Sequence, residues 1–189
     1  MRPVTPSTAA MLTATQAEMM PTAIPDTYDD LIRAAATLYL PDYDWRLYKA
    51  QLWQESHFNP EAISPSGAQG IAQFMPDTWI EAYQALDFGP VSPFSVPEAI
   101  EAGAWYMNRM LAGWTSPRPA MDRYKLALAS YNAGFGNLIK AQKRVGGKLL
   151  YAEIIQGLPQ ITGRHSAETI EYVRKICDVY WPRLKAETE

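Results

Sequence analysis

The chain has 189 residues, a formal net charge of −3, and 48% hydrophobic and 12% aromatic residues. This length fits one domain with a substantial buried core, and the nearly balanced charge excludes a general attraction to nucleic acid or to anionic membranes. The single cysteine, Cys177, excludes an internal disulfide framework, and with only His57 and His165 beside it we expect no metal site.

The first residues differ in composition from the rest. Residues 1–25 are rich in Pro, Thr, Ala and Met, which indicates an arm or linker that is flexible or docks onto a partner. The alternative within this segment is a short helix from about Ser7 to Met20. Pro3 and Pro6 interrupt the apolar stretch that a Sec-type signal needs, so none is evident. No apolar run is long enough to cross a bilayer, and residues 26–189 form the expected folded domain.

From residue 26 onward, the apolar spacing predicts a series of helices. A helix through Leu31 and Leu38 stops before Pro41, and Pro76 suits the first turn of another. Ser95 and Glu98 have the spacing of a capping box. The other expected ranges are 44–57, 76–85, 96–113, 122–133, 136–145 and 167–181. No stretch alternates over the length of a strand, so we predict a mainly α fold, with a short hairpin between residues 59 and 73 left open.

One acidic residue stands on an apolar stripe. Leu52, Tyr48 and Trp45 precede Glu55 at helical spacing, so its carboxyl group continues an apolar face. Such a group loses hydration, which raises its pKa and suits it to act as a general acid. The alternative is a structural glutamate paired with an arginine or with backbone donors.

A glycine-rich loop follows this helix. Gly67, Ala68 and Gly70 leave room for a sugar ring or for tight turns, while Ser64 and Gln73 carry groups that can hydrogen-bond hydroxyl or acetamido groups. The loop would therefore allow a polymer to approach the acid.

Four motifs occur in order along the chain. They are Glu55-Ser56-x-x-x-Pro60, Gly67-Ala68-x-Gly70-Ile71-x-Gln73-Phe74-Met75-Pro76, Tyr131-Asn132-Ala133-Gly134 and Glu168-Thr169-x-x-Tyr172-Val173. Together, over about residues 27–181, they resemble the motif set of the soluble lytic transglycosylase catalytic domain. The resemblance implies a lysozyme-like single domain with a substrate cleft.

The resemblance also implies an activity. The family cleaves the β-1,4 bond between N-acetylmuramic acid and N-acetylglucosamine in peptidoglycan. The residue matching Glu55 protonates the leaving oxygen and then, as a carboxylate, takes the proton from the muramic C6 hydroxyl, which leaves a 1,6-anhydro end. This chemistry needs no metal and no organic cofactor. Its partner is the glycan strand, and its place of action is the bacterial cell wall or periplasm.

Further site residues are implied by the same matches. Ser64 and Gln73 contact substrate near the acid, and Met75 lines the cleft. Tyr131 faces the acid, and Asn132 holds the local structure or the sugar. Glu168 lies at the saccharide cleft, and Tyr172, one helical turn later, shares its surface. The alternative for Met75 and Tyr131 is that they pack in the core, and the alternative for Glu168 is that its charge stabilises the helix dipole.

Two other functions stay open. A muramidase of the same fold would use water and, as a conventional glycosidase, a second carboxylate. Nothing in the sequence around Glu61, Asp77 and Glu81 directs these acids to the cleft of Glu55. The more distant Glu168 could reach this cleft through the fold. A non-catalytic wall-binding or assembly protein is the other alternative. The short chain suits a phage endolysin or virion-associated enzyme, or a bacterial enzyme exported by another route, with residues 1–25 docking onto phage-particle or secretion-apparatus proteins.

Overall fold

The computed structural model describes residues 23–187, and this part of the chain is built from helices without a strand. The mainly α prediction is therefore confirmed. In chain order the elements are α2 (Asp29–Tyr39), α3 (Trp45–Ser56), α4 (Pro76–Ala85), α5 (Val96–Gly113), α6 (Ala120–Ala133), α7 (Phe135–Arg144), α8 (Tyr151–Ile154), the 3-10 helix η1 (Ile155–Gly157), α9 (Pro159–Thr162), α10 (His165–Arg174), the π-helix η2 (Lys175–Tyr180) and α11 (Trp181–Ala186).

Helices α3 and α6 lie at the centre of the fold. Residues 47–52 of α3 and 126–130 of α6 are buried without interruption, so each helix is covered round most of its circumference. Helix α3 contacts α2 and η2, and α6 contacts α5, α7 and α10. The sequence predicted one apolar stripe along the helix that carries Glu55. The buried surface of this helix is wider than one stripe, because α3 is a core helix.

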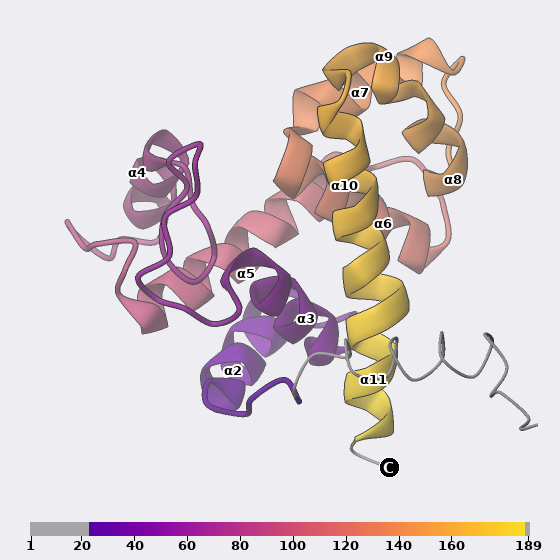
Figure 1. The fold of residues 1–189 in the computed structure, drawn as a ribbon. Helices are drawn as coiled ribbons and strands as arrows, with labels where there is room; N and C mark the ends of the chain where they lie inside the picture. Colours follow the sequence, from indigo (N-terminus) through magenta and orange to yellow (C-terminus); the bar gives the residue numbers. More distant parts are fainter. Residues whose placement is uncertain (1–22, 188–189) are drawn as a thin grey trace, which may run out of the picture.

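Three groups of elements surround this centre. Helices α10, η2 and α11 follow one another as one long column (Figure 1). Helix α4 and the loop before it form a lobe on one side, and α7, α8 and α9 gather around the upper part of the column (Figure 1). The lobe and the column thus stand on either side of the C-terminal end of α3.

Several helix boundaries follow the sequence signals. Helix α4 runs from Pro76 to Ala85 as predicted, and Gly134 ends α6 with a φ of +88° that favours glycine. Asp44 caps α3, its side chain accepting the Arg46 amide at 3.0 Å. Helices α8, η1 and α9 were not predicted, because each is too short to show a 3.6-residue period.

Other expectations at helix ends were wrong. The Ser95 hydroxyl donates to the Glu98 carboxylate, so the two side chains bond each other and not the backbone as in a capping box. The last predicted helix, 167–181, is interrupted by the π-helix η2. The buried face of α10 includes Thr169, Tyr172 and Val173, and Ile170 beside them is 38% exposed.

The loop after α3 reverses direction sharply. His57 and Phe58 both have positive φ, at 52° and 59°, which turns the chain immediately after the helix. Ile63 with Gln69, and Gln69 with Phe74, form isolated antiparallel bridges. The hairpin left open by the sequence is thus reduced to two bridges.

The start of the described chain is anchored on α3. Ile24 is buried in the core, and the buried Lys49 ammonium pairs with Asp26 at 2.7 Å and with Asp29 at 2.6 Å. The helix expected between Ser7 and Met20 lies outside the described residues.

We predict that two glycines of the loop respond differently to alanine. Both have positive φ, so either substitution costs about 1–2 kcal/mol of backbone strain. At Gly67 a Cβ atom meets nothing within 4 Å, whereas at Gly70 it would lie 2.0 Å from the Pro93 carbonyl oxygen. Gly70→Ala should therefore lose roughly 1–3 kcal/mol more than Gly67→Ala. Thermal unfolding followed by circular dichroism measures this, and equal melting temperatures would contradict the close contact.

Candidate active site

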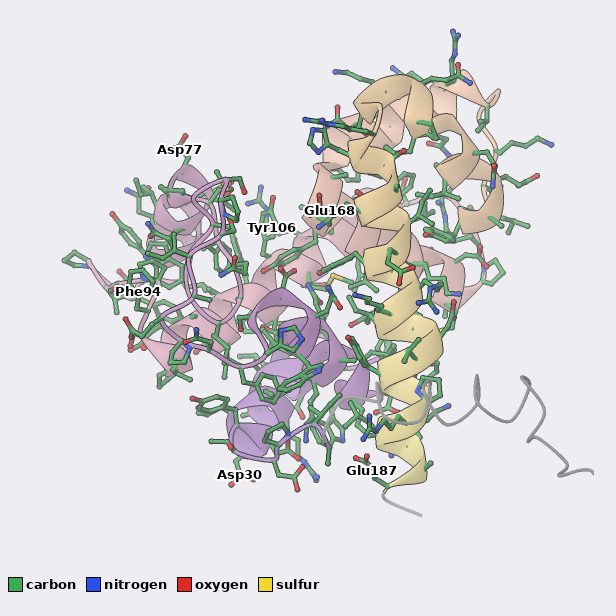
Figure 2. The ribbon with its side chains drawn as sticks, viewed as in Figure 1. Asp30, Asp77, Phe94, Tyr106, Glu168 and Glu187 are labelled. Carbon is green, nitrogen blue, oxygen red and sulfur yellow. The ribbon has the colours of Figure 1, made fainter. Side chains whose placement is uncertain are left out.

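Residues from all four motifs meet at one cavity of about 390 Å³. The eight residues singled out from the sequence line it together with five others. The complete lining is Gln54, Glu55, Ser64, Ser66, Ala68, Gln73, Met75, Tyr131, Asn132, Glu168, Glu171, Tyr172 and Lys175. Figure 2 shows Glu168 on the side of α10 that faces the lobe carrying α4. Segments more than 100 residues apart in sequence, such as those of Glu55 and Tyr172, are thus adjacent here.

Glu55 lies in the last turn of α3, and its half-buried side chain lines the cavity. Burial raises its pKa to about 8, a hydrogen bond from Tyr172 opposes this rise, and the charge of Glu168 adds to it. The Tyr172 hydroxyl donates to Oε1 of Glu55 at 2.5 Å. This partner is a neutral phenol and not an arginine, so the carboxyl group stays largely protonated at neutral pH and can donate a proton.

Tyr131 and Asn132, in the last turn of α6, link this helix to the loop and to α10 by hydrogen bonds. The Tyr131 hydroxyl donates to the Ala72 carbonyl at 2.9 Å, and Asn132 Oδ1 accepts from the Thr169 hydroxyl at 2.7 Å. Burial and then the charge of Glu55 raise the pKa of Tyr131 well above its ordinary value, which keeps the phenol neutral. Tyr131 therefore lies in the electrostatic environment of the acid.

The polar groups of the loop also fold the loop itself. Ser64 Oγ lies 3.0 Å from Ser66 Oγ and accepts the Ala68 amide at 3.0 Å. Gln73 has a φ of +51° and donates from Nε2 to the Gly70 carbonyl at 2.8 Å. Met75 is 45% exposed, so it lines the cavity and does not fill the core.

A second carboxylate faces the same cavity. Glu168 lies in the first turn of α10, whereas Glu61, Asp77 and Glu81 are not among the lining residues. A neighbouring cavity of about 480 Å³ shares Glu168, Asn132 and Ser66 with the first, so the concave surface continues along α10.

Sequence reasoning named Ala68 as part of the open loop but missed four other lining residues, of which two had a clear signal. Glu168, Glu171, Tyr172 and Lys175 follow the i, i+3, i+4, i+7 spacing of one helix face, which would have indicated Glu171 and Lys175. Gln54, in the last turn of α3, and Ser66, in the loop, carried no comparable signal.

Within residues 23–187, no group of three or more His, Cys, Asp or Glu side chains is placed to hold a metal ion. Over the same range, none of the helices combines the length and the apolar character that crossing a membrane requires. Cys177 is buried, and burial raises the pKa of its thiol to about 12.

The model of the family described as transglycosylase SLT domain matches residues 31–154. The chain belongs to this family. It is 30% identical over 138 residues to the membrane-bound lytic murein transglycosylase F of Photobacterium profundum, covering 71% of this chain and 26% of that protein. It is 32% identical over 158 residues to the protein of the same name from Pectobacterium atrosepticum, covering 80% and 31%. The SLT-domain chain thus spans less than a third of the length of these relatives.

Solved structures agree on the fold. The 70-kDa soluble lytic transglycosylase of Escherichia coli superposes with a TM-score of 0.70 at 21% identity, over 94% of this chain and 27% of that one. The same enzyme in complex with bulgecin A gives a TM-score of 0.71. The lysozyme-like architecture of this SLT domain is thereby supported by structure as well as by sequence.

We predict that the acid weakens the fold as the pH rises. Glu55 has a pKa near 4.5 when unfolded and about 8 when folded, so its stabilising contribution is complete below pH 4.5 and is lost between pH 4.5 and 8. Within that window the loss is about 1.4 kcal/mol per pH unit. Glu55→Gln should therefore gain stability relative to the wild type on going from acidic to mildly alkaline pH.

Urea unfolding of both proteins at several pH values measures this difference. The exposed Glu61, substituted by Gln, is the control and should show no such trend. Parallel stability curves for the wild type and Glu55→Gln would show that the carboxyl group titrates normally.

Proposed function

We propose that this SLT domain is a peptidoglycan lytic transglycosylase in which Glu55 acts first as an acid and then as a base. The observation that supports this most strongly is the position of Glu55, whose carboxyl group lines the cavity and accepts the Tyr172 hydroxyl. Burial there raises its pKa to about 8, as suits a proton donor. The names of the curated relatives, lytic murein transglycosylases, supply the substrate class. The proposed place of action is accordingly the bacterial cell wall.

The proposed reaction has two steps that balance in protons. Protonated Glu55 gives its proton to the glycosidic oxygen as the bond from that oxygen to C1 of the muramic residue breaks. The Glu55 carboxylate then takes the proton from the C6 hydroxyl as O6 bonds to C1. The product carries a 1,6-anhydro ring, and Glu55 is protonated again. A group whose pKa lies near the working pH suits both steps.

Tyr172 has a defined part in this cycle. Its hydroxyl donates to Oε1 of Glu55, and this hydrogen bond favours the charged carboxylate. Between the two steps, when Glu55 is an anion in a largely buried place, this donor would stabilise it.

The glycan strand would lie along the cavity between the loop and α10. Met75 offers an apolar surface, and Ser64, Gln73 and Asn132 offer polar groups beside it. Glu168 lies where the first cavity meets the second, so it would contact a sugar next to the scissile bond. This division leaves Glu55 for the chemistry and the remaining residues for binding.

A muramidase is the second candidate, because Glu168 faces the same cavity as Glu55. In such an enzyme Glu168 would activate water or attack the sugar. The proposed docking of residues 1–25 onto a phage particle or secretion apparatus stays a prediction, since residues 1–22 lie outside the described chain. The curated relatives named above come from bacteria.

We predict that Glu55→Gln and Glu168→Gln differ in severity. The amide keeps the shape of Glu55 and removes its proton, so release of soluble muropeptides from isolated peptidoglycan should fall by roughly 10²–10⁴-fold. Glu168→Gln should mainly raise KM, because it alters a contact and not the proton donor. If both substitutions abolish turnover equally, two catalytic carboxylates are required and the muramidase becomes the better account.

We also predict an alkaline limit to the reaction. The first step needs protonated Glu55, so kcat/KM should fall above about pH 8. Tyr172→Phe removes the hydrogen bond that lowers the pKa of Glu55, so the limit should move to higher pH in that variant. A pH profile of kcat/KM with soluble muropeptide oligomers tests both statements, and a limit unchanged by Tyr172→Phe would contradict the assigned contact.

A further inference from the structure

A buried amide next to the site has no assigned task. Gln51 of α3 is 0% exposed, and neither its Nε2 nor its Oε1 completes a hydrogen bond with another described residue. A buried polar group without a partner is costly, roughly 1–3 kcal/mol, and such groups are rare in folded proteins. An apolar side chain of similar length would fill the same space without that cost, so the amide calls for a functional explanation.

The position of Gln51 connects it with the acid. It precedes Glu55 by four residues on the same helix, so the two side chains share one face of α3. The same face meets Tyr172 of α10, whose hydroxyl donates to Glu55 at 2.5 Å. Gln51 thus lies on the face of α3 that carries Glu55, and Glu55 in turn accepts the Tyr172 hydroxyl.

The amide also acts on the ionisation of Tyr172. Burial and then Glu55 raise the pKa of Tyr172 well above its ordinary value, and Gln51 lowers it. Only a hydrogen-bond donor favours the phenolate form, and the donor of the amide is its Nε2 group.

We propose that Gln51 is a positioning residue, whose unpartnered Nε2 group turns to the Tyr172 hydroxyl oxygen, donates to it and so keeps the Tyr172 hydrogen directed at Oε1 of Glu55. A phenolic hydroxyl can rotate about its C–O bond, and a donor on its oxygen leaves the hydrogen free to point toward the carboxyl group. The donor also polarises the hydroxyl, which strengthens its bond to Glu55. The catalytic consequence rests on the proposed function, but the positioning itself does not.

Substitution of Gln51 leaves the other polar and charged residues near Glu55 unchanged in the sequence. The charge of Glu168 of α10 raises the pKa of Glu55, and the charge of Glu55 in turn raises the pKa of Tyr48 of α3 and of Tyr131 of α6. Glu171 and Lys175 line the same cavity from α10 and η2. A change in the titration of Glu55 after substitution of Gln51 alone therefore reports on the path through Tyr172.

The decisive test is a carbon-13 NMR titration of Glu55, with glutamate labelled at its carboxyl carbon and the signal assigned by its loss in Glu55→Gln. Gln51→Met keeps the side-chain length and removes the donor, so the titration midpoint of Glu55 should move to higher pH. In a Tyr172→Phe background the same substitution should leave the midpoint unchanged. An equal midpoint in the wild type and Gln51→Met, or an equal shift with and without the Tyr172 hydroxyl, would overturn the proposal.

Controls separate positioning from general damage to the core. Leu52→Met alters the neighbouring buried position of α3 and should leave the midpoint where it is. If Gln51→Met does not fold, Gln51→Leu provides the same comparison. With peptidoglycan as substrate, kcat should fall roughly fivefold in Gln51→Met, as expected for one neutral hydrogen bond, with KM little changed. The NMR result is independent of turnover, so an inactive wild type would refute the proposed function and leave the positioning test intact.

Discussion

The hydrogen bond between the Tyr172 hydroxyl and the Glu55 carboxyl group is the contact on which the site depends. It joins α3 to α10, although the two residues are 117 positions apart in the sequence. The Tyr172 side chain is buried and that of Glu55 is half-buried. Burial favours the neutral carboxylic acid, and the phenol favours the anion. Because these two effects oppose each other, the acid is poised near the pH at which it can both lose and regain a proton.

The rest of the fold maintains this balance. Helices α3 and α6 are buried over consecutive residues, so the ends that carry Glu55 and Tyr131 cannot move independently of the core. The loop is tied back to both helices, by the Ser56 hydroxyl donating to the Ile71 carbonyl at 2.9 Å and by Tyr131 donating to the Ala72 carbonyl. A desolvated carboxyl group destabilises the fold at alkaline pH, and this extensive packing offsets that cost.

Sequence reasoning singled out Glu55, which lines the cavity, and located the ends of several helices, because these depend on local patterns. Pro76 and Gly134 mark a helix start and a helix end through their own backbone geometry. Other features depend on tertiary contacts and left no local pattern. The left-handed turn at His57 and Phe58 uses residues without a preference for positive φ, and the π-helix η2 replaces what reads as an ordinary helix. The burial of Gln51 likewise follows from packing against another helix and not from its neighbours in sequence.

The central claim is that the sugar's own C6 hydroxyl, and not water, completes the reaction started by Glu55. Digesting isolated peptidoglycan in water labelled with a heavy oxygen isotope, followed by mass spectrometry of the soluble muropeptides, tests it most directly. The account predicts anhydromuropeptides that are one water lighter than hydrolysis products and carry no label. Reducing-end muropeptides that contain the heavy isotope would contradict it and would show that this SLT domain is a hydrolase.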